Sequence, residues 1–233
     1  MILPPVQQFG ILIRRYKRFL ADISLATGER LTVHCPNSGS MRGCSDPGSL
    51  VMISKSDNPR RKYAWTLEMV QHHRIWIGVN TARTNHIVRE ALENETINDF
   101  GRILSIRPEI KVSGRSRLDF LLTTKAGPVY LEVKNCSLAE NRTAMFPDAV
   151  TARGTKHLHE LDRLRGQGNT CAVLFCIQRG DADRFMAAAH IDPEYAETLR
   201  KVRENGVQVL AYRAEVTPEA ITLTTRLPVQ KDG

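Results

Sequence analysis

The chain has 233 residues, of which 42% are apolar and 25% are charged, and this composition excludes a disordered or fibrous protein. It contains neither a run of about 18 apolar residues nor a basic and apolar leader at its start, so we expect no membrane partner and no secretion. Five cysteines without a CxxC pair predict no disulfide framework. A folded cytoplasmic protein is the expectation.

The net charge of +8 is unevenly distributed along the chain. Residues 1–90 contain 13 Lys and Arg against 6 Asp and Glu, a net charge of +7, and the remainder has a net charge of +1. A basic N-terminal region favours a polyanionic partner, because each neutralised phosphate releases condensed counterions. A solvated basic face explains the same numbers equally well, so charge alone leaves both interpretations open.

Residues 9–80 predict short β-strands separated by turns. The expected strands span 10–25, 31–35, 49–55, 63–71 and 74–80, with one hairpin turn at 26–29 and another around His72 and His73. Five strands without a long helix indicate a small barrel. We favour an OB-like barrel over residues 1–80, because that fold commonly binds oligonucleotides on its curved face.

Basic and aromatic residues follow one another in the first expected strand. The segment reads Arg14-Arg15-Tyr16-Lys17-Arg18-Phe19. Its cations can follow the phosphates of a nucleic acid while a ring stacks on a base. Because side chains alternate along a strand, Arg14 and Arg18 share one face. Arg15 and Lys17 share the other, so the four cations do not all meet one ligand.

Two further groups in this region are candidates for nucleic-acid contact. Arg60, Arg61 and Lys62 form a basic cluster in an expected loop, where a solubilising charge run is the alternative. Asn37 and Ser38 lie in the turn-rich segment 36–40, whose exposed amides suit an anion. An ordinary turn is the alternative for this segment.

Beyond residue 80 the pattern changes to mixed helices and strands, which predicts an α/β domain over residues 81–233. Thr81 is expected to cap a helix that runs to about Glu93. Further helices are expected at 150–165 and 193–205, and strands at 110–112, 117–123, 129–135, 170–178 and 207–214.

Two of these strands form a hairpin whose register places three charged residues together. If Asp119 pairs with Glu132, the chain folds back between Lys125 and Ala126, where turn residues stand. Opposed residues share a face, with Cβ atoms roughly 4.5–5.5 Å apart. Lys134 lies two residues after Glu132 and therefore points to the same face. The pattern predicts that two carboxylates and one ammonium converge.

These three residues suit the metal-dependent hydrolysis of a phosphodiester. Asp119 and Glu132 offer the carboxylate oxygens that Mg²⁺ or Mn²⁺ prefers, and a bound ion polarises the phosphate and lowers the pKa of water. Lys134 positions that water or stabilises the developing charge. The alternative is a surface ion pair between Lys134 and Glu132 on the exposed face of a half-buried hairpin.

The spacing D-x12-E-x-K, formed by Asp119, Glu132 and Lys134, resembles the PD-(D/E)xK nuclease superfamily, with Leu118 in the place of its usual proline. The chain as a whole resembles the sugar fermentation stimulation protein family. The motifs that carry this resemblance are HCPNSGSM at 34–41, SRLDF at 116–120, LEVK at 131–134, FPDAVTARG at 146–154 and KHL at 156–158. The resemblance implies an N-terminal OB-like domain, a C-terminal nuclease-like domain with an αβββαβ core, and DNA binding.

Four more candidate residues lie on the helices around the hairpin. The resemblance implies that Glu90, on the preceding helix, is a further catalytic carboxylate, and a solvated helix carboxylate is the alternative. Arg153, Lys156 and His157 lie at the start of the following helix, where basic or polar groups can meet the scissile phosphate. An ordinary amphipathic helix would also place them there.

Three functions are compatible with these observations. The leading hypothesis is a protein that grips nucleic acid, DNA rather than RNA, and cuts it with Mg²⁺ or Mn²⁺. The second is a DNA-binding regulator of sugar (maltose) metabolism that retains the nuclease fold without cleavage, and its link to sugar rests on the family name alone. The third is a basic protein that binds a small phosphorylated metabolite. The intact set of Asp119, Glu132 and Lys134 favours the first, because a regulator has no chemical need for all three.

Overall fold

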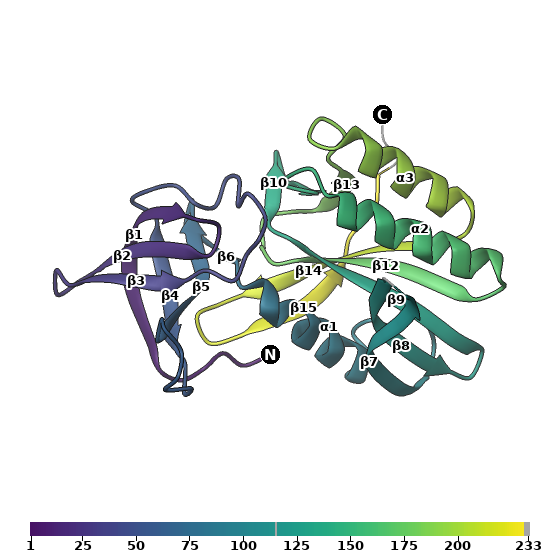
Figure 1. The fold of residues 1–233 in the computed structure, drawn as a ribbon, viewed down its shortest axis with the longest axis horizontal. Helices are drawn as coiled ribbons and strands as arrows, with labels where there is room; N and C mark the ends of the chain where they lie inside the picture. The colour runs from purple at the N-terminus through teal and green to yellow at the C-terminus, as the bar shows by residue number, and fades with distance from the viewer. Residues whose placement is uncertain (115, 231–233) are drawn as a thin grey trace.

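The computed structural model describes residues 1–114 and 116–230, which form two domains side by side (Figure 1). The N-terminal domain consists of β1 (Gln7–Tyr16), β2 (Leu20–Leu25), β3 (Arg30–His34), β4 (Leu50–Lys55), β5 (Trp65–His72) and β6 (Ile75–Gly78). Strands β1 to β5 close into a barrel, because β3 pairs with β2 on one side and with β5 on the other. The expected OB barrel is thereby confirmed, and β6 pairs with β5 as an additional strand.

The barrel closes around apolar side chains, and each of its five strands contributes to them. Leu12, Ile23, Val33, Val51 and Leu67 are at most 1% exposed. Because side chains alternate along a strand, every second position can point inwards. Each short strand therefore contributes to one common core.

The expected strand 10–25 is in fact two strands. The chain reverses at Lys17 and Arg18, whose φ angles are 49° and 61°, and Arg15 then pairs with Ala21 across β1 and β2. Positive φ is usually adopted by Gly, Asn or Asp, so the basic segment carries no turn signal. Lys17 and Arg18 lie in a turn rather than on a strand face, which corrects the alternation expected for residues 14–19.

The C-terminal domain has the αβββαβ order expected for a PD-(D/E)xK nuclease fold. That order is formed by α1 (Thr84–Glu93), β7 (Ile103–Ser113), β8 (Ser116–Thr124), β9 (Gly127–Cys136), α2 (Ala152–Gly166) and β12 (Thr170–Ile177). The main sheet has the strand order β15-β14-β12-β9-β8-β7, in which β14 is Gln208–Val216 and β15 is Ile221–Arg226. Strands β9, β12 and β14 are parallel neighbours in it.

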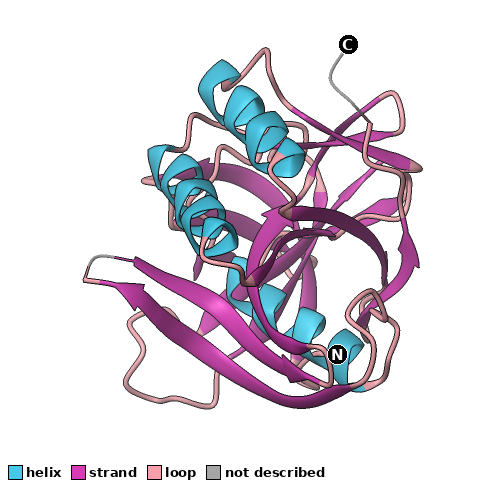
Figure 2. Ribbon diagram, turned by 90° about the vertical axis from the view of Figure 1, so that its right-hand side faces the viewer, coloured by secondary structure: helices cyan, strands magenta, loops and turns pink. Residues whose placement is uncertain are grey.

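Helices cover both faces of this sheet (Figure 2). Helix α1 contributes Val88 to the core on one face, and α2 contributes Leu158 to the core on the other, which α3 (Pro193–Glu204) also covers. Neighbouring residues of β12 alternate between the two cores, with Leu174 in the first and Phe175 in the second. A strand buried on both faces is apolar throughout. Within the described residues, no helix combines the length and the apolar character that a membrane span requires.

Several elements differ from those that the sequence predicts. Strand β7 begins at Ile103 instead of residue 110, and most of its added residues are exposed or half-buried at the sheet edge. The sequence did not predict β15 or the small sheet formed by β10 (Leu138–Glu140), β11 (Thr143–Phe146) and β13 (Arg184–Ala187). Short strands and edge strands lack a long apolar alternation, which is the signal that sequence reading uses.

The start of α1 also differs from the prediction. A 3₁₀ turn at Thr81–Arg83 precedes the helix, and its N-cap is Asn80, whose side chain accepts a hydrogen bond from Ala82 N. Thr81 instead donates from its hydroxyl to Pro36 O at 2.7 Å. The residue expected to cap the helix therefore links it to the loop after β3.

The barrel contacts the second domain through the end of β6. Gly78 N donates to Gln178 O at 2.9 Å. A Cβ at residue 78 would lie 2.3 Å from Gln178 Oε1 and 3.1 Å from Gln178 Cβ, so the glycine allows this close approach. At the start of the chain, Leu3 N donates to Glu219 O and Leu3 packs in the core of the second domain. The first residues of the segment 1–80 thus pack against the C-terminal domain.

Candidate active site

The predicted hairpin register is present. Strands β8 and β9 pair antiparallel up to Phe120 opposite Leu131, and the same register continued by one residue sets Asp119 opposite Glu132. The ladder stops there, and Val133 N donates to Asp119 Oδ2 at 2.8 Å. A side-chain carboxylate therefore takes over as the hydrogen-bond acceptor at the end of the hairpin, next to Glu132.

Asp119 is held between the hairpin and α1. Its Oδ1 accepts a hydrogen bond from Asn85 Nδ2 at 2.8 Å, and its Oδ2 accepts the one from Val133 N. Burial, together with the nearby charge of Glu132, raises the pKa of Asp119 to about 6 in spite of these two hydrogen bonds. Asp119 is therefore mostly ionised at neutral pH, and a bound cation would relieve its repulsion with Glu132.

Glu132, Lys134 and His157 form a buried cluster. Glu132 is 2% exposed, and its Oε1 accepts a hydrogen bond from Lys134 Nζ at 2.6 Å and contacts His157 Nδ1. Burial alone would raise the pKa of Glu132, but the Lys134 charge and the His157 hydrogen bond outweigh burial and lower it. Glu132 is thus an ionised carboxylate in an interior position. The predicted alternative of an exposed ion pair does not describe it, because Lys134 is also mostly buried.

The donor set at this cluster fits a hard divalent cation. Glu132 Oε2 is buried and has no hydrogen-bond partner in the described residues, and Asp119 supplies a second carboxylate beside it. In the part of the chain that the structure describes, no three His, Cys, Asp or Glu side chains come together as a complete metal site. Mg²⁺ is commonly bound through one or two carboxylates, with waters and substrate phosphates as its other ligands. Asp119 and Glu132 are sufficient for that mode of binding.

Glu90 is placed away from this cluster. Its Oε1 accepts a hydrogen bond from the Met1 ammonium at 2.6 Å, and its side chain is 45% exposed. The residue of α1 that contacts Asp119 is Asn85, from the first turn of the helix. The resemblance implied that Glu90 joins the hairpin carboxylates. The structure does not bring these side chains together.

Asn85 and Tyr195 are two residues near the cluster that the sequence did not indicate. Tyr195, from α3, is fully buried, and its hydroxyl has no partner among the described residues. A Cβ at Gly154 of α2 would lie 3.1 Å from Tyr195 Cε2, so the ring packs directly on the helix that carries His157. A signal for Asn85 exists in retrospect, because it precedes buried Val88 by three residues and so lies on the apolar side of α1.

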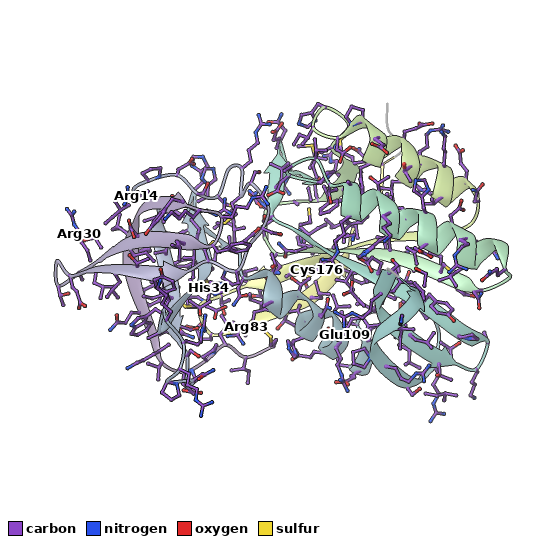
Figure 3. The ribbon with its side chains drawn as sticks, viewed as in Figure 1. Arg14, Arg30, His34, Arg83, Glu109 and Cys176 are labelled. Atoms are coloured by element: carbon purple, nitrogen blue, oxygen red, sulfur yellow. The ribbon has the colours of Figure 1, made fainter. Side chains whose placement is uncertain are left out.

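A second buried carboxylate belongs to the domain junction and not to the site. Glu68 is 0% exposed, and its oxygens accept hydrogen bonds from Ser54, Asn80 and Arg83. Arg83 lies between the two domains (Figure 3). Each oxygen of Glu68 has protein partners, which identifies it as a structural carboxylate.

The predicted nucleic-acid contacts on the barrel divide into exposed and structural residues. Arg14 lies on the outer face, where it pairs with Asp22 at 2.8 Å and stacks over Tyr16 at 4.8 Å from the ring centre. Together with Arg30 it borders a hollow of about 460 Å³. Figure 3 shows both arginines on the part of the barrel that is remote from the second domain. This face remains available to a ligand.

Arg15 and Asn37 instead organise the loop after β3. The Arg15 guanidinium donates to the carbonyl oxygens of Asn37, Gly39 and Ser40, at 2.8, 2.8 and 3.1 Å. Asn37 is 3% exposed, and its side chain donates to Val79 O at 3.0 Å. Ser38, between them, remains exposed. Only Ser38 of these three therefore presents its side chain freely to solvent.

The three basic residues Arg60, Arg61 and Lys62 also differ in their surroundings. Arg61 donates to Thr66 Oγ1 at 3.0 Å and lies 3.0 Å from His34 Nδ1, so it joins β5 to β3 where the barrel closes. Burial and the charge of Arg61 lower the pKa of His34. Arg60 and Lys62 are exposed, so they remain candidates for a phosphate.

Arg153, Lys156 and His157 follow the N-terminus of α2 as predicted, but they face different surroundings. Arg153 and Lys156 are exposed, whereas His157 is 6% exposed and contacts Glu132. The position of His157 in the cluster was not predicted. Residues i and i+3 or i+4 of a helix share a face, so Arg153 lies one turn before His157 and near the site.

Fold and site together define the class of protein: an OB barrel joined to a PD-(D/E)xK nuclease-like domain. Two family models match the chain, the SfsA N-terminal OB domain over residues 13–79 and the sugar fermentation stimulation protein RE domain over residues 82–220. The chain belongs to the sugar fermentation stimulation protein (SfsA) family. The family that the motifs indicated is thereby confirmed.

Relatives match nearly the whole length. A sugar fermentation stimulation protein homolog of Desulfotalea psychrophila is 56% identical over 91% of this chain and 90% of its own. A homolog of Pelobacter propionicus is 52% identical over 98% of this chain and 99% of its own. Among solved structures, SfsA of Pyrococcus furiosus in complex with Ca²⁺ matches with a TM-score of 0.90 and 25% identity, over 99% of this chain and 98% of that chain.

Proposed function

We propose that this chain hydrolyses phosphodiester bonds of nucleic acid, DNA rather than RNA, with a divalent metal ion held by Asp119 and Glu132. The observation that carries the proposal is the cluster at the end of the β8–β9 hairpin, where the buried carboxylate of Glu132 and the half-buried carboxylate of Asp119 meet Lys134. Two like charges side by side in the interior oppose folding. Such an arrangement is typical of a functional site rather than of a structural one.

Each residue has a distinct part in the proposed reaction. Asp119 and Glu132 would hold Mg²⁺ or Mn²⁺, which when bound supplies Lewis acidity and a water of lowered pKa. Lys134 presents its ammonium beside Glu132 and stabilises negative charge that develops on a phosphoryl oxygen. His157 holds the Glu132 carboxylate from α2, and Asn85 holds Asp119 from α1.

The comparisons support a divalent cation in this fold. The Pyrococcus furiosus relative was solved in complex with Ca²⁺. Ca²⁺ and Mg²⁺ are both hard cations that take oxygen ligands, although Ca²⁺ accepts more of them. A pair of carboxylates that binds one of these ions is a candidate ligand set for the other.

The barrel supports a polyanionic substrate. The basic excess of the first 90 residues includes Arg14 and Arg30, which lie on the outer face of β1 and β3. Exposed cations on an OB barrel bind phosphates by releasing counterions, and Tyr16 on the same face adds an aromatic side chain. We place the reaction in the cytoplasm, which the five buried free thiols support.

The test is cleavage of labelled single-stranded and double-stranded DNA and RNA with Mg²⁺, with Mn²⁺ or with chelator. The wild type is compared with Glu132→Gln and with Glu93→Gln, a matched change at an exposed carboxylate of α1. We expect the wild type and Glu93→Gln to cut only with metal, and Glu132→Gln to bind without cutting. Cleavage that persists in chelator or in Glu132→Gln would exclude the assignment.

One observation favours a second function, a DNA-binding regulator that does not cleave. Lys134 and His157 both contact Glu132 Oε1, so the protein itself already compensates one of the two carboxylates. A cluster balanced in this way can persist as a structural remnant of a nuclease. Metal-independent DNA binding without cleavage on any of the four substrates is the result that this alternative predicts.

A further inference from the structure

A cleft of about 360 Å³ lies between the two domains. On the barrel side its wall is formed by the turn after β1 and the loop after β3, and on the other side by the ends of β9 and β11 and the segment before α2. Asn135, in this wall, directly follows Lys134, and Thr151 caps the helix that carries His157. The cleft therefore lies at the end of β9, the strand that carries Glu132 and Lys134, at the junction of the two domains seen in Figure 1.

One aromatic residue contributes to the lining of the cleft. Phe146 is half-buried and lies in the cleft wall. Its ring packs against Tyr195 and Phe175, with ring centres 5.1 and 5.4 Å apart. Both supporting rings are fully buried, so Phe146 is held in place from behind. A rigid, partly accessible ring of this kind is what a nucleobase stacks on.

Hydrogen-bonding groups surround this ring. Asn135 Oδ1 accepts a hydrogen bond from Gln178 Nε2 at 2.5 Å, which fixes the amide, and its Nδ2 has no partner among residues 1–114 and 116–230. The Ser38 hydroxyl, in the barrel-side wall, is exposed and likewise makes no hydrogen bond to the described chain. Asp148 Oδ2 accepts from Met41 N, which leaves Oδ1 as an acceptor. Amides, hydroxyls and carboxylates are the groups that read the edges of nucleobases.

The cleft is preformed, and its charged lining residues are Arg18 and Asp148. Arg15 fixes the loop that carries Ser38, and Asp148 ties the same loop to the second domain through Met41 N at 2.9 Å. Arg18 lines the cleft from the turn after β1, and its φ of 61° holds the backbone in an uncommon conformation there. Strained backbone at a ligand site persists when the surrounding structure fixes it.

We propose that the cleft binds one unpaired nucleobase of the strand that is cut, stacked on Phe146 and hydrogen-bonded by Asn135 and Ser38, with Arg18 on an adjoining phosphate. The inference rests on the proposed nuclease function and names its substrate class, nucleic acid with an unpaired base beside the scissile bond. The cleft has the size of a small-molecule pocket. It accommodates one base outside a stack, whereas a base pair within a duplex does not fit.

The test measures affinity rather than cleavage, in the full chain carrying Glu132→Gln so that bound DNA stays intact. Two end-labelled duplexes are compared, one fully paired and one with a single unpaired nucleotide. Ser38→Trp fills the cleft from an exposed position. The matched control is Gln167→Trp, at the exposed opposite end of α2.

We expect the unpaired nucleotide to increase affinity about 5- to 150-fold, the range of one base stacked on an aromatic ring. Ser38→Trp removes this preference, and Gln167→Trp retains it. Phe146→Leu, which keeps an apolar side chain against Tyr195, reduces the preference. Equal affinity for both duplexes, or a preference that survives in Ser38→Trp, overturns the proposal.

The two proposals fail in distinguishable ways. If the wild type cuts DNA with metal and shows no preference for an unpaired base, the cleft proposal alone is overturned. If the preference is present and depends on Ser38 while no substrate is cut, base binding stands and hydrolysis does not.

Discussion

The candidate active site and the basic face of the barrel hold their charges in opposite ways. At the hairpin, Glu132 is 2% exposed and is paired with Lys134 and His157 from two different elements. On the barrel, the Arg14 side chain is 65% exposed and pairs with Asp22 of the next strand. Buried charges depend strongly on their neighbours, whereas exposed charges are screened by salt. The proposed function therefore assigns reactivity to the hairpin and affinity for nucleic acid to the barrel.

The largest expected effect is on catalysis at the hairpin. Lys134→Ala removes the ammonium beside Glu132, and we expect the cleavage rate to fall about 10²- to 10³-fold, as when one charge-stabilising donor is lost. Single-turnover cleavage measures the change. Lys125→Ala, in the exposed turn of the same hairpin, is the control and should leave the rate unchanged. Equal rates for wild type and Lys134→Ala would remove Lys134 from the mechanism.

The second effect is a pH dependence of stability without metal. The pKa of Asp119 is raised to about 6 in the folded chain, above its value of about 3.8 when unfolded. The contribution of Asp119 to the free energy of unfolding is therefore most favourable below pH 4. This contribution falls by roughly 3 kcal/mol as the pH rises to 6. In urea unfolding with chelator, the wild type should lose stability relative to Asp119→Asn across this window. Parallel pH profiles for the two proteins would contradict the raised pKa.

The third effect tests whether His157 supports the cluster. His157→Ala leaves Glu132 buried with one partner fewer, and we expect a loss of about 1–3 kcal/mol in the free energy of unfolding. His159→Ala changes an exposed histidine two residues later on the same helix and should have little effect. Equilibrium unfolding in urea compares the two. If they behave alike, the contact between His157 and Glu132 does not stabilise the fold.

A smaller effect is expected on the barrel. Arg14→Ala removes one exposed cation, so it should reduce the slope of log affinity against log salt concentration by about one, uniformly across DNA sequences. Stability should hardly change, because exposed ion pairs contribute about 0–1 kcal/mol. DNA titrations at several salt concentrations measure the slope. Arg200→Ala, on the exposed side of α3, is the control. An identical decrease in slope for this variant would show that the barrel face contributes no more to DNA binding than another exposed surface.

The smallest expected effect concerns Glu90. Its partner is the Met1 ammonium and not the hairpin, so Glu90→Gln should leave the cleavage rate within about twofold of the wild type, a difference below 0.5 kcal/mol. The same single-turnover assay measures the cleavage rate of Glu90→Gln. A loss comparable to that of Lys134→Ala would restore the role implied for this residue by family resemblance.

The sequence predicted the parts of the molecule that obey a local period. Asp119 and Glu132 were placed in register from the turn at Lys125 and Ala126, because side-chain period and turn position together fix a hairpin. The closed barrel was predicted from strand spacing, although β1 and β2 were read as one strand. A turn made by Lys17 and Arg18 carries no glycine or asparagine to reveal it.

What the sequence could not supply are contacts between elements far apart in the chain. Asn85 meets Asp119 across 34 residues, and His157 meets Glu132 across 25. These distances are closed by helix packing on the two faces of the sheet, which no local pattern specifies. Arg15 shows the same limit, because a basic residue on a strand predicts a ligand contact, whereas the structure uses it to hold the loop at residues 37–40.

The most direct test of the account is a calorimetric titration of the protein with Mn²⁺, for wild type, Glu132→Gln and Glu93→Gln. We predict that wild type and Glu93→Gln bind Mn²⁺ with the same affinity, and that Glu132→Gln binds at least about tenfold more weakly, as when a metal ligand or its close support is lost. Equal affinity in all three proteins, or no binding to the wild type, would contradict the assignment of Asp119 and Glu132 as the metal-binding pair.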